Sequence, residues 1–205
     1  MLPGRPYKFN CPVCRKKYLR PTLHSGNTYG GRMWSDGKKE FPMLPSYPKI
    51  TKCDICSKYF WIEDAHNSGI NDNNECTQVR FLNIDEYFEY LNTNTNLQIN
   101  REGHVRISIL WLYNDKVRRN ETKFIDDIDK QKWINNLELL LNLYNKIDNG
   151  EQVILCSEIL RELSYFDKSL EYIKNINEKS EYYKLAKQII EKCENKESKV
   201  FVLKG

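Results

Sequence analysis

The 205-residue sequence lacks the long apolar runs of a membrane protein. No stretch approaches the ~18 consecutive apolar residues of a membrane-spanning helix, and the first residues lack the apolar core of a secretion signal. We therefore expect a soluble, cytoplasmic protein with no membrane partner. Alanine is also scarce, with two residues, whereas Lys, Asn and Ile together supply 61. This bias is typical of an A/T-rich genome, so any single surface lysine is weak evidence for a function.

Sequence motifs for catalysis are missing as well. The three histidines, His24, His66 and His104, are far apart in the sequence. The chain contains no G-x-S-x-G, H-E-x-x-H, phosphate-loop or dinucleotide-binding motif. We therefore expect no enzymatic activity and assign no catalytic residue. An enzyme that uses the Gly-rich stretch 25–37 remains the least favoured alternative.

Proline is absent after Pro48, and this absence divides the chain. A segment dense in proline and glycine favours short strands and loops, whereas the rest of the chain can form long helices. We predict an α+β protein with a small β module at 1–65, a polar connection at 66–82 and an all-α body at 83–205.

The net charge of +4 conceals two unlike parts. Residues 1–62 carry 12 Lys and Arg against 3 Asp and Glu, a net +9, whereas residues 63–205 carry 20 against 25, a net −5. A basic segment of this kind indicates an acidic partner. Four metal-bound thiolates would reduce the charge of the basic segment, which weakens the indication.

Two C-x-x-C motifs are the most specific signal in the chain. They contain Cys11, Cys14, Cys53 and Cys56, with 38 residues between the pairs. Two residues between cysteines allow a tight turn that directs both sulfurs at one ion, and four thiolates suit tetrahedral Zn²⁺. We predict a structural zinc site, with iron as the alternative metal. A small module with few aliphatic residues also needs a metal to stabilise its fold.

The sequences around these cysteines, CPVC followed by KKY and KCDIC followed by SKYFW, resemble the zinc-ribbon, rubredoxin-like family. The resemblance covers residues 7–62 and implies that each cysteine pair leads into a β-hairpin, with strands near 18–19 and 59–62. Many family members carry glycine after the second cysteine, where the chain takes a left-handed turn. Arg15 and Ser57 occupy these positions here, so the turn is either tighter or altered, or is kept with a residue other than glycine, which the backbone can tolerate.

The segment between the cysteine pairs, residues 20–48, is longer than most loops without a function or structure of their own. One interpretation is an ordered turn that packs on the helical body. The other is a site for a ligand or partner, for which we select Ser25, Asn27, Arg32, Trp34 and Asp36. Both interpretations remain open from the sequence.

Apolar residues recur at helical spacing over several later ranges. They predict helices near 84–91, 131–147, 153–163, 166–176 and 179–195, with Asn83 or Asp85 at the first N-terminus. The segment 104–115 alternates at first like a strand, but we favour a buried helix. Cys156 and Cys193 are expected to be core residues, and 116–119 and 126–129 to be solvated connections.

Residues 153–176 resemble one tetratricopeptide-type helical hairpin, with Phe166 after the turn and Ser169 at the usual small position. Ser157 and Ser164 stand where glycines are usual. The combination resembles bacterial proteins in which a zinc ribbon precedes tetratricopeptide-like helices. It implies an adapter that binds a protein or peptide, although a plain helical bundle would give the same pattern.

The competing interpretation is nucleic-acid binding by the basic module. Its aromatic residues could stack on exposed bases; they are Tyr7, Tyr18, Tyr29, Trp34, Tyr59 and Trp61. Lys16, Lys17 and Lys39 are the candidate phosphate contacts. The oligomeric state and the identity of a partner do not follow from the sequence.

Overall fold

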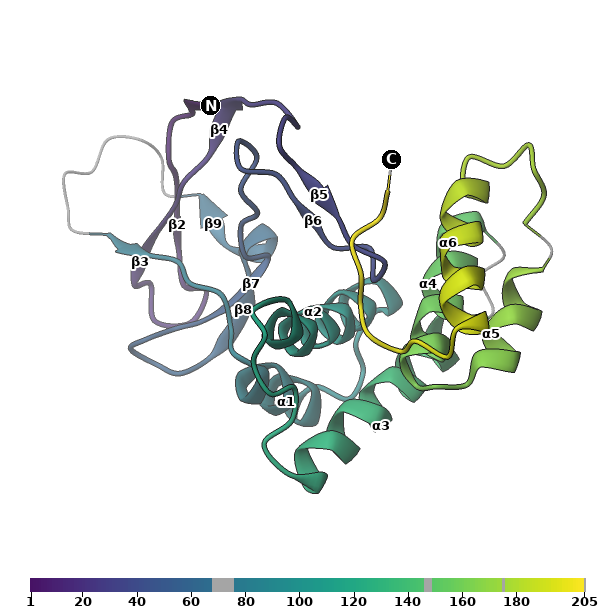
Figure 1. Cartoon of the computed structure of the whole chain (residues 1–205). Coiled ribbons are helices and arrows are strands. Elements are labelled where there is room, and N and C mark those ends of the chain that lie inside the picture. Colours follow the sequence, from purple (N-terminus) through teal and green to yellow (C-terminus); the bar gives the residue numbers. More distant parts are fainter. Residues whose placement is uncertain (68–75, 146–148, 175, 205) are drawn as a thin grey trace. The chain divides into compact units, whose positions relative to one another are not determined.

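The computed structural model describes residues 1–67, 76–145, 149–174 and 176–204. It is a mixed structure of small sheets and helices, as the predicted α+β class requires (Figure 1). The chain forms two compact units. The first comprises Met1–Gly31 and Glu40–Tyr90, and the second comprises Arg32–Lys39 and Leu91–Gly205.

The first unit is built mainly from short strands. A four-stranded sheet has the order β10-β3-β2-β9, and two further pairs are β1-β4 and β7-β8. Their bounds are β1 Leu2–Pro3, β2 Tyr7–Asn10, β3 Lys17–Arg20, β4 Leu23–Ser25, β7 Ile50–Lys52, β8 Tyr59–Trp61, β9 His66–Asn67 and β10 Thr77–Gln78. Strands β3 and β8 therefore lie where the family resemblance implied hairpins. A 3-10 turn, η1, covers Ile62–Asp64.

Aromatic side chains form the core of this unit. Phe9 pairs with Tyr18 across β2 and β3, and both rings pack against Phe60 of β8. All three side chains are buried, with Ile62 and Val79 beside them. Val79 and the strands β9 and β10 fall within the predicted connection 66–82, parts of which therefore belong to the sheet and core.

Helix α1 (Ile84–Thr93) begins at a reciprocal pair of hydrogen bonds. The Glu86 N–H donates to Asn83 Oδ1 at 2.9 Å, and the Asn83 N–H donates to Glu86 Oε2 at 3.0 Å. This is a capping box, so Asn83 rather than Asp85 caps the helix.

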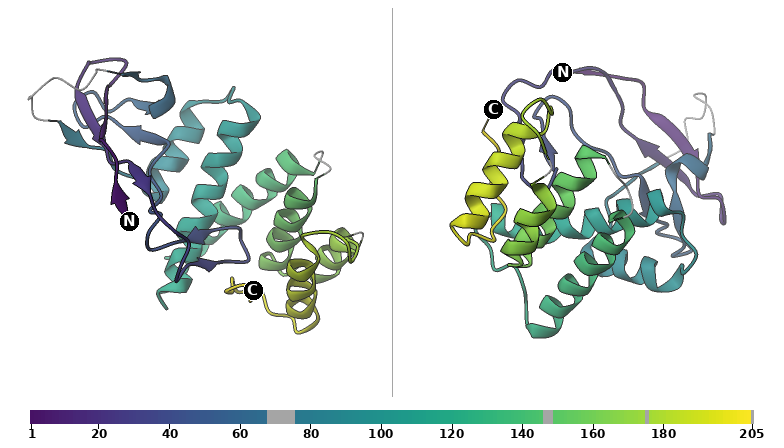
Figure 2. Two further views of the ribbon diagram at one scale, coloured as in Figure 1. Left: turned by 90° about the horizontal axis from the view of Figure 1, so that it is seen from above. Right: turned by 90° about the vertical axis from the view of Figure 1, so that its right-hand side faces the viewer.

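The second unit contains five helices among its described residues. They are α2 Ile99–Arg118, α3 Asp127–Tyr144, α4 Gly150–Glu162, α5 Phe166–Ile173 and α6 Tyr183–Glu194. Helix α2 covers 104–115 and confirms the helical interpretation of that segment. Both views in Figure 2 keep α4, α5 and α6 side by side. Searched over the described residues, the helices include none with the length and apolar character to cross a membrane.

Three of these helices end in a residue with left-handed backbone. Asn120, Ser164 and Lys196 have φ angles of 57°, 64° and 55° after α2, α4 and α6. After α4, for example, the Ser164 N–H donates to the Arg161 carbonyl and the Tyr165 N–H to the Leu160 carbonyl. This Schellman pattern ends the helix and starts the tight turn into α5.

Small residues let α4 and α5 approach closely. Ser157 and Ser169 are completely buried, and their hydroxyl oxygens lie 2.9 Å apart. Cys156 and Cys193 are also fully buried, which confirms the prediction that they are core residues.

Candidate metal centre

The four cysteines of the two C-x-x-C motifs form one cluster. The sulfurs of Cys11, Cys14, Cys53 and Cys56 all lie within 4.8 Å of one another. Cys11 Sγ lies 3.7 Å from Cys56 Sγ, and Cys14 Sγ lies 3.5 Å from Cys53 Sγ. A tetrahedral zinc ion with Zn–S bonds of about 2.3 Å requires sulfur separations of about 3.8 Å. The cluster can therefore hold a metal ion.

The two cysteine turns repeat the same backbone pattern. In the first, the Cys11 N–H donates to the Lys16 carbonyl and the Arg15 N–H donates to the Cys11 carbonyl. In the second, Cys53, Ser57 and Lys58 make the corresponding bonds, all between 2.8 and 3.1 Å in the two turns.

Arg15 and Ser57 adopt the left-handed conformation at equivalent points of these turns, with φ angles of 63° and 57°. The sequence left an altered turn open because neither residue is glycine. The structure agrees with the other alternative: both residues keep the left-handed turn, at the conformational cost that a Cβ brings in this region.

Tyr18 supports the second cysteine turn from β3. Its hydroxyl donates to Cys53 Sγ at 3.3 Å, contacts the Asp54 carboxylate and accepts the Asp54 N–H at 2.9 Å. Burial keeps the pKa of Tyr18 above its usual range, so the hydroxyl retains its proton and remains a donor. The sequence alone predicts base stacking for Tyr18 and does not predict this contact with Cys53.

The thiols differ in their tendency to ionise. Burial raises the pKa of Cys11 to about 12. Burial opposes ionisation of Cys53 as well, but hydrogen bonds from the Cys56 N–H, the Tyr18 hydroxyl and the Ile55 N–H outweigh it and lower the pKa to about 6. A lowered pKa favours the thiolate, which is the form that binds a metal ion.

Comparisons of the chain with protein-family models, with curated proteins and with solved structures found no match. Four sulfurs occupy all four positions of a tetrahedral site, which leaves none for water or substrate and is typical of a structural metal.

The five residues selected as a possible ligand or partner site lie between the two cysteine pairs. They are divided between the two units. Ser25 ends β4, and the Asn27 side chain accepts the Tyr29 N–H at 3.0 Å in a local turn. Arg32 is exposed in the two-residue strand β5 (Arg32–Met33), which pairs with β6 (Lys39–Glu40). Trp34 and Asp36 belong to the helical unit.

Asp36 lies in a buried polar network of the helical unit. Its side chain is completely buried, and its Oδ2 accepts hydrogen bonds from Asn114 Nδ2 at 2.8 Å and from Arg118 Nη2. The Arg118 guanidinium also lies 4.7 Å from the centre of the Trp34 ring. The side chains of Trp34 and Asp36 therefore have partners within their own chain, as expected for an ordered turn that packs on the helical body.

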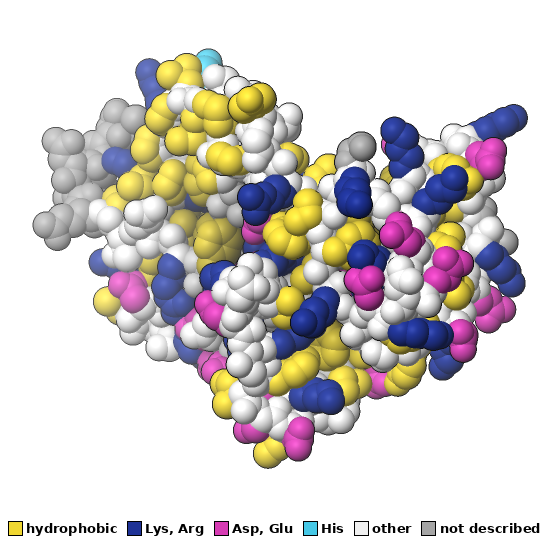
Figure 3. All heavy atoms as spheres, viewed as in Figure 1, with side chains coloured by type: hydrophobic (Ala, Val, Ile, Leu, Met, Phe, Trp, Pro, Cys, Tyr) yellow, Lys and Arg dark blue, Asp and Glu magenta, His cyan; other side chains and the backbone are white. Residues whose placement is uncertain are grey.

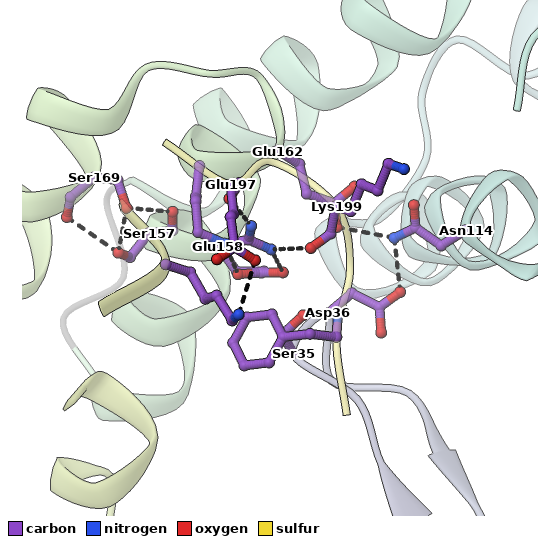
Figure 4. Close-up of polar contacts among 12 residues, drawn as sticks. Ser35, Asp36, Asn114, Ser157, Glu158, Glu162, Ser169, Glu197 and Lys199 are labelled. Carbon is purple, nitrogen blue, oxygen red and sulfur yellow. Dashed lines mark hydrogen bonds and ion pairs between the residues drawn. The ribbon is translucent and has the colours of Figure 1, made fainter. Parts of the chain in front are cut away.

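The network continues beyond Asp36 (Figure 4). Asn114 also donates to Glu162 Oε1 at 2.8 Å, and Lys123 pairs with Glu162 Oε2 at 3.2 Å. Burial raises the pKa of Glu162 to about 7 although Lys123 opposes the shift. The prediction that 116–119 is a solvated connection is wrong, because 116–118 form the end of α2 and the Arg118 side chain is 5% exposed.

The candidate nucleic-acid residues do not form a continuous stacking surface. Tyr18 and Trp61 are buried, and Trp61 donates to the Tyr90 hydroxyl. Tyr59 bonds to Glu89, whereas Tyr29 is 87% exposed. Burial therefore prevents Tyr18 and Trp61 from stacking on bases.

The positive charge of the first unit is also partly neutralised. Lys52 pairs with Glu89, and Arg80 pairs with Glu86. Lys16 and Lys17 are half-buried, and Lys39 is exposed in β6. On the helical unit, at the right of Figure 3, basic and acidic side chains are interspersed.

Proposed function

We propose that this protein is a non-enzymatic, cytoplasmic adapter with a structural Zn(Cys)₄ centre and a tetratricopeptide-like helical body that binds a protein or peptide. The observation that supports it most strongly is the cluster of four sulfurs within 4.8 Å of one another. Its two turns have the same hydrogen-bond pattern, as in a ribbon built around one ion.

Zinc suits the site because it accepts four thiolates in a tetrahedron and needs no redox partner. Iron is the alternative, since it takes the same ligands. Elemental analysis of the purified protein distinguishes them. We expect one zinc per chain and a colourless protein, whereas a red protein with one iron per chain contradicts the choice of zinc.

Substitution of the ligands tests the structural role. Cys11→Ser and Cys53→Ser should lose the metal and the folded first unit, whereas Cys193→Ser should retain one metal per chain because Cys193 is buried between helices. Full metal content in Cys11→Ser or Cys53→Ser would contradict the proposed ligand set.

The adapter role rests on the packing of α4, α5 and α6 and on the lack of a sequence motif for catalysis. Direct binding between the purified protein and a purified partner should survive at high salt and be lost when exposed residues of this helical surface are changed. Absence of any directly binding protein or peptide would contradict the adapter role.

Nucleic-acid binding is the second candidate, and the exposed Tyr29 of the first unit and the exposed Lys39 of the second unit favour it. It requires an affinity that falls steeply with salt concentration. Reversing the charge of Lys16, Lys17 or Lys39 should then reduce binding to single-stranded RNA and DNA. Binding that does not depend on salt would argue against it.

A further inference from the structure

The segment between the cysteine turns connects the metal centre to the helical unit through the chain itself. Cys14 and Cys53, at its two ends, have sulfurs 3.5 Å apart in the cluster. The middle of the segment, Arg32–Lys39, belongs to the helical unit, while Gly31 and Glu40 on either side belong to the first unit. The chain therefore passes from the first unit to the second and returns.

Helix α2 holds this segment by four polar contacts. Asn114 and Arg118 both donate to the Asp36 carboxylate, and the Trp111 indole N–H donates to the Asp36 carbonyl at 3.0 Å. A nearby ion pair joins Lys38 to Asp115 at 2.5 Å.

The C-terminal residues hold the other side of the segment. The Ser35 N–H donates to the Phe201 carbonyl at 2.9 Å, and the Phe201 N–H donates to Ser35 Oγ at 3.1 Å. Trp34 and Val202 form an antiparallel bridge, and the Leu203 N–H donates to the Met33 carbonyl at 2.8 Å. We call Arg32–Lys39 together with residues 197–204 the strap.

The C-terminal part of the strap also contacts helices α4 and α6. Arg161 of α4 is completely buried and donates to the Glu197 and Lys199 carbonyls. Gln188 of α6 exchanges two hydrogen bonds with the Lys204 backbone at 2.8 and 3.0 Å. The strap is thus held by α2, α4 and α6.

A segment whose two ends are held by a folded unit docks at a higher effective concentration than one held by an unfolded chain. The metal closes the chain between Cys14 and Cys53 and so limits the positions that Arg32–Lys39 can reach. Loss of the metal removes this restriction. It does not change the residues that the strap contacts when it is docked.

We propose that metal binding at the four cysteines keeps the strap docked on the helical unit, and that metal loss releases it and uncovers a surface that binds a carboxylate. This inference rests on the metal binding proposed above. The uncovered groups are the Asn114 amide and the Arg118 guanidinium, which receive the Asp36 carboxylate in the docked state. The partner that fits is therefore an extended peptide with an acidic side chain.

Hydrogen exchange of the full chain, metal-loaded and metal-free under reducing conditions, tests the release. We expect amide exchange in 33–36 and 200–203 to accelerate about tenfold or more on metal removal, while α4 and α6 keep their protection. Unchanged protection of 33–36 overturns the proposal. Equal loss of protection throughout α4 and α6 also overturns it, because the metal would then hold the whole fold.

Reciprocity provides a second test. If metal binding favours docking by a given factor, docking favours metal binding by that same factor. A variant that populates the undocked state should therefore bind the metal more weakly, by at most this factor. We expect Asp36→Ala to lower the zinc affinity at least threefold, whereas the control Asp167→Ala, at a side chain 96% exposed on α5, should not. Equal affinities in the two variants overturn the coupling.

A peptide with the sequence of residues 32–39, RMWSDGKK, tests the uncovered surface. Fluorescein-labelled peptide should bind the metal-free chain at least tenfold more tightly than the metal-loaded chain, and the peptide RMWSAGKK should bind neither. Equal binding to both states, or none to the metal-free state, overturns the proposed access.

Metal content measured in the same samples separates the two proposals. A purified chain that never contains metal refutes the metal centre itself. A chain with one metal per molecule and an unchanged strap refutes only the metal-controlled release.

Discussion

Replacing Asp36 by alanine tests whether a residue of the segment between the cysteine pairs stabilises the helical unit. Its carboxylate is completely buried and accepts hydrogen bonds from Asn114 and Arg118. Alanine would leave the buried Arg118 guanidinium without this partner. Asn114 would keep its bond to Glu162, and Arg118 would keep its ion pair with Asp115 at 2.6 Å.

The expected cost follows from these remaining contacts. Removing one partner of a buried ion pair costs about 3–5 kcal/mol when the other charge is left uncompensated. Asp115 still compensates Arg118 in part, and its side chain is 17% exposed. We therefore expect Asp36→Ala to lower the free energy of unfolding of the helical unit by about 2–3 kcal/mol.

Urea unfolding of the metal-loaded protein, followed by far-ultraviolet circular dichroism, measures this change. The exposed Asp167→Ala variant is the matched control and should change the unfolding free energy by less than about 0.5 kcal/mol. A loss below about 0.5 kcal/mol in Asp36→Ala would refute the reasoning, because the buried network would then contribute nothing that water cannot replace.

Three further changes test other parts of the structure. Tyr18→Phe removes the hydroxyl that donates to Cys53, so zinc affinity measured by chelator competition should fall about tenfold; unchanged affinity would contradict the supporting role. Arg15→Gly and Ser57→Gly relieve left-handed backbone, so each should raise the melting temperature and the stability by about 0.5–1 kcal/mol, and a decrease would contradict the assigned turn. Burial raises the pKa of Glu162 from 4.5 to about 7, so the folded state binds more protons in this window and stability should fall as pH rises through it. Glu162→Gln should remove that fall, which unfolding at pH 5 and pH 8 measures; an unchanged pH dependence would show that Glu162 is not its source.

Features encoded by short-range patterns could be predicted from the sequence. The spacing of the cysteine pairs identified the sulfurs that come together, because two intervening residues restrict each turn. Helical periodicity located α3 to α6, and the burial of Cys156 and Cys193 followed from their positions on apolar helix faces.

Other features required contacts between distant residues. Runs of charged residues usually face water, so the sequence of 116–119 predicts a solvated connection. Arg118 is nevertheless buried, since Asp36, 82 positions earlier in the chain, provides an opposite charge. No local pattern contains this pairing.

The sequence by itself therefore determined which four cysteines come together, the fold class and the approximate helices, because spacing and periodicity depend on neighbouring residues. Only the tertiary structure decided that Arg32–Lys39 belongs to the helical unit and that Tyr18 supports Cys53. These features depend on which distant side chains share a buried environment, where an unpaired polar group is costly and its partner can come from any part of the chain.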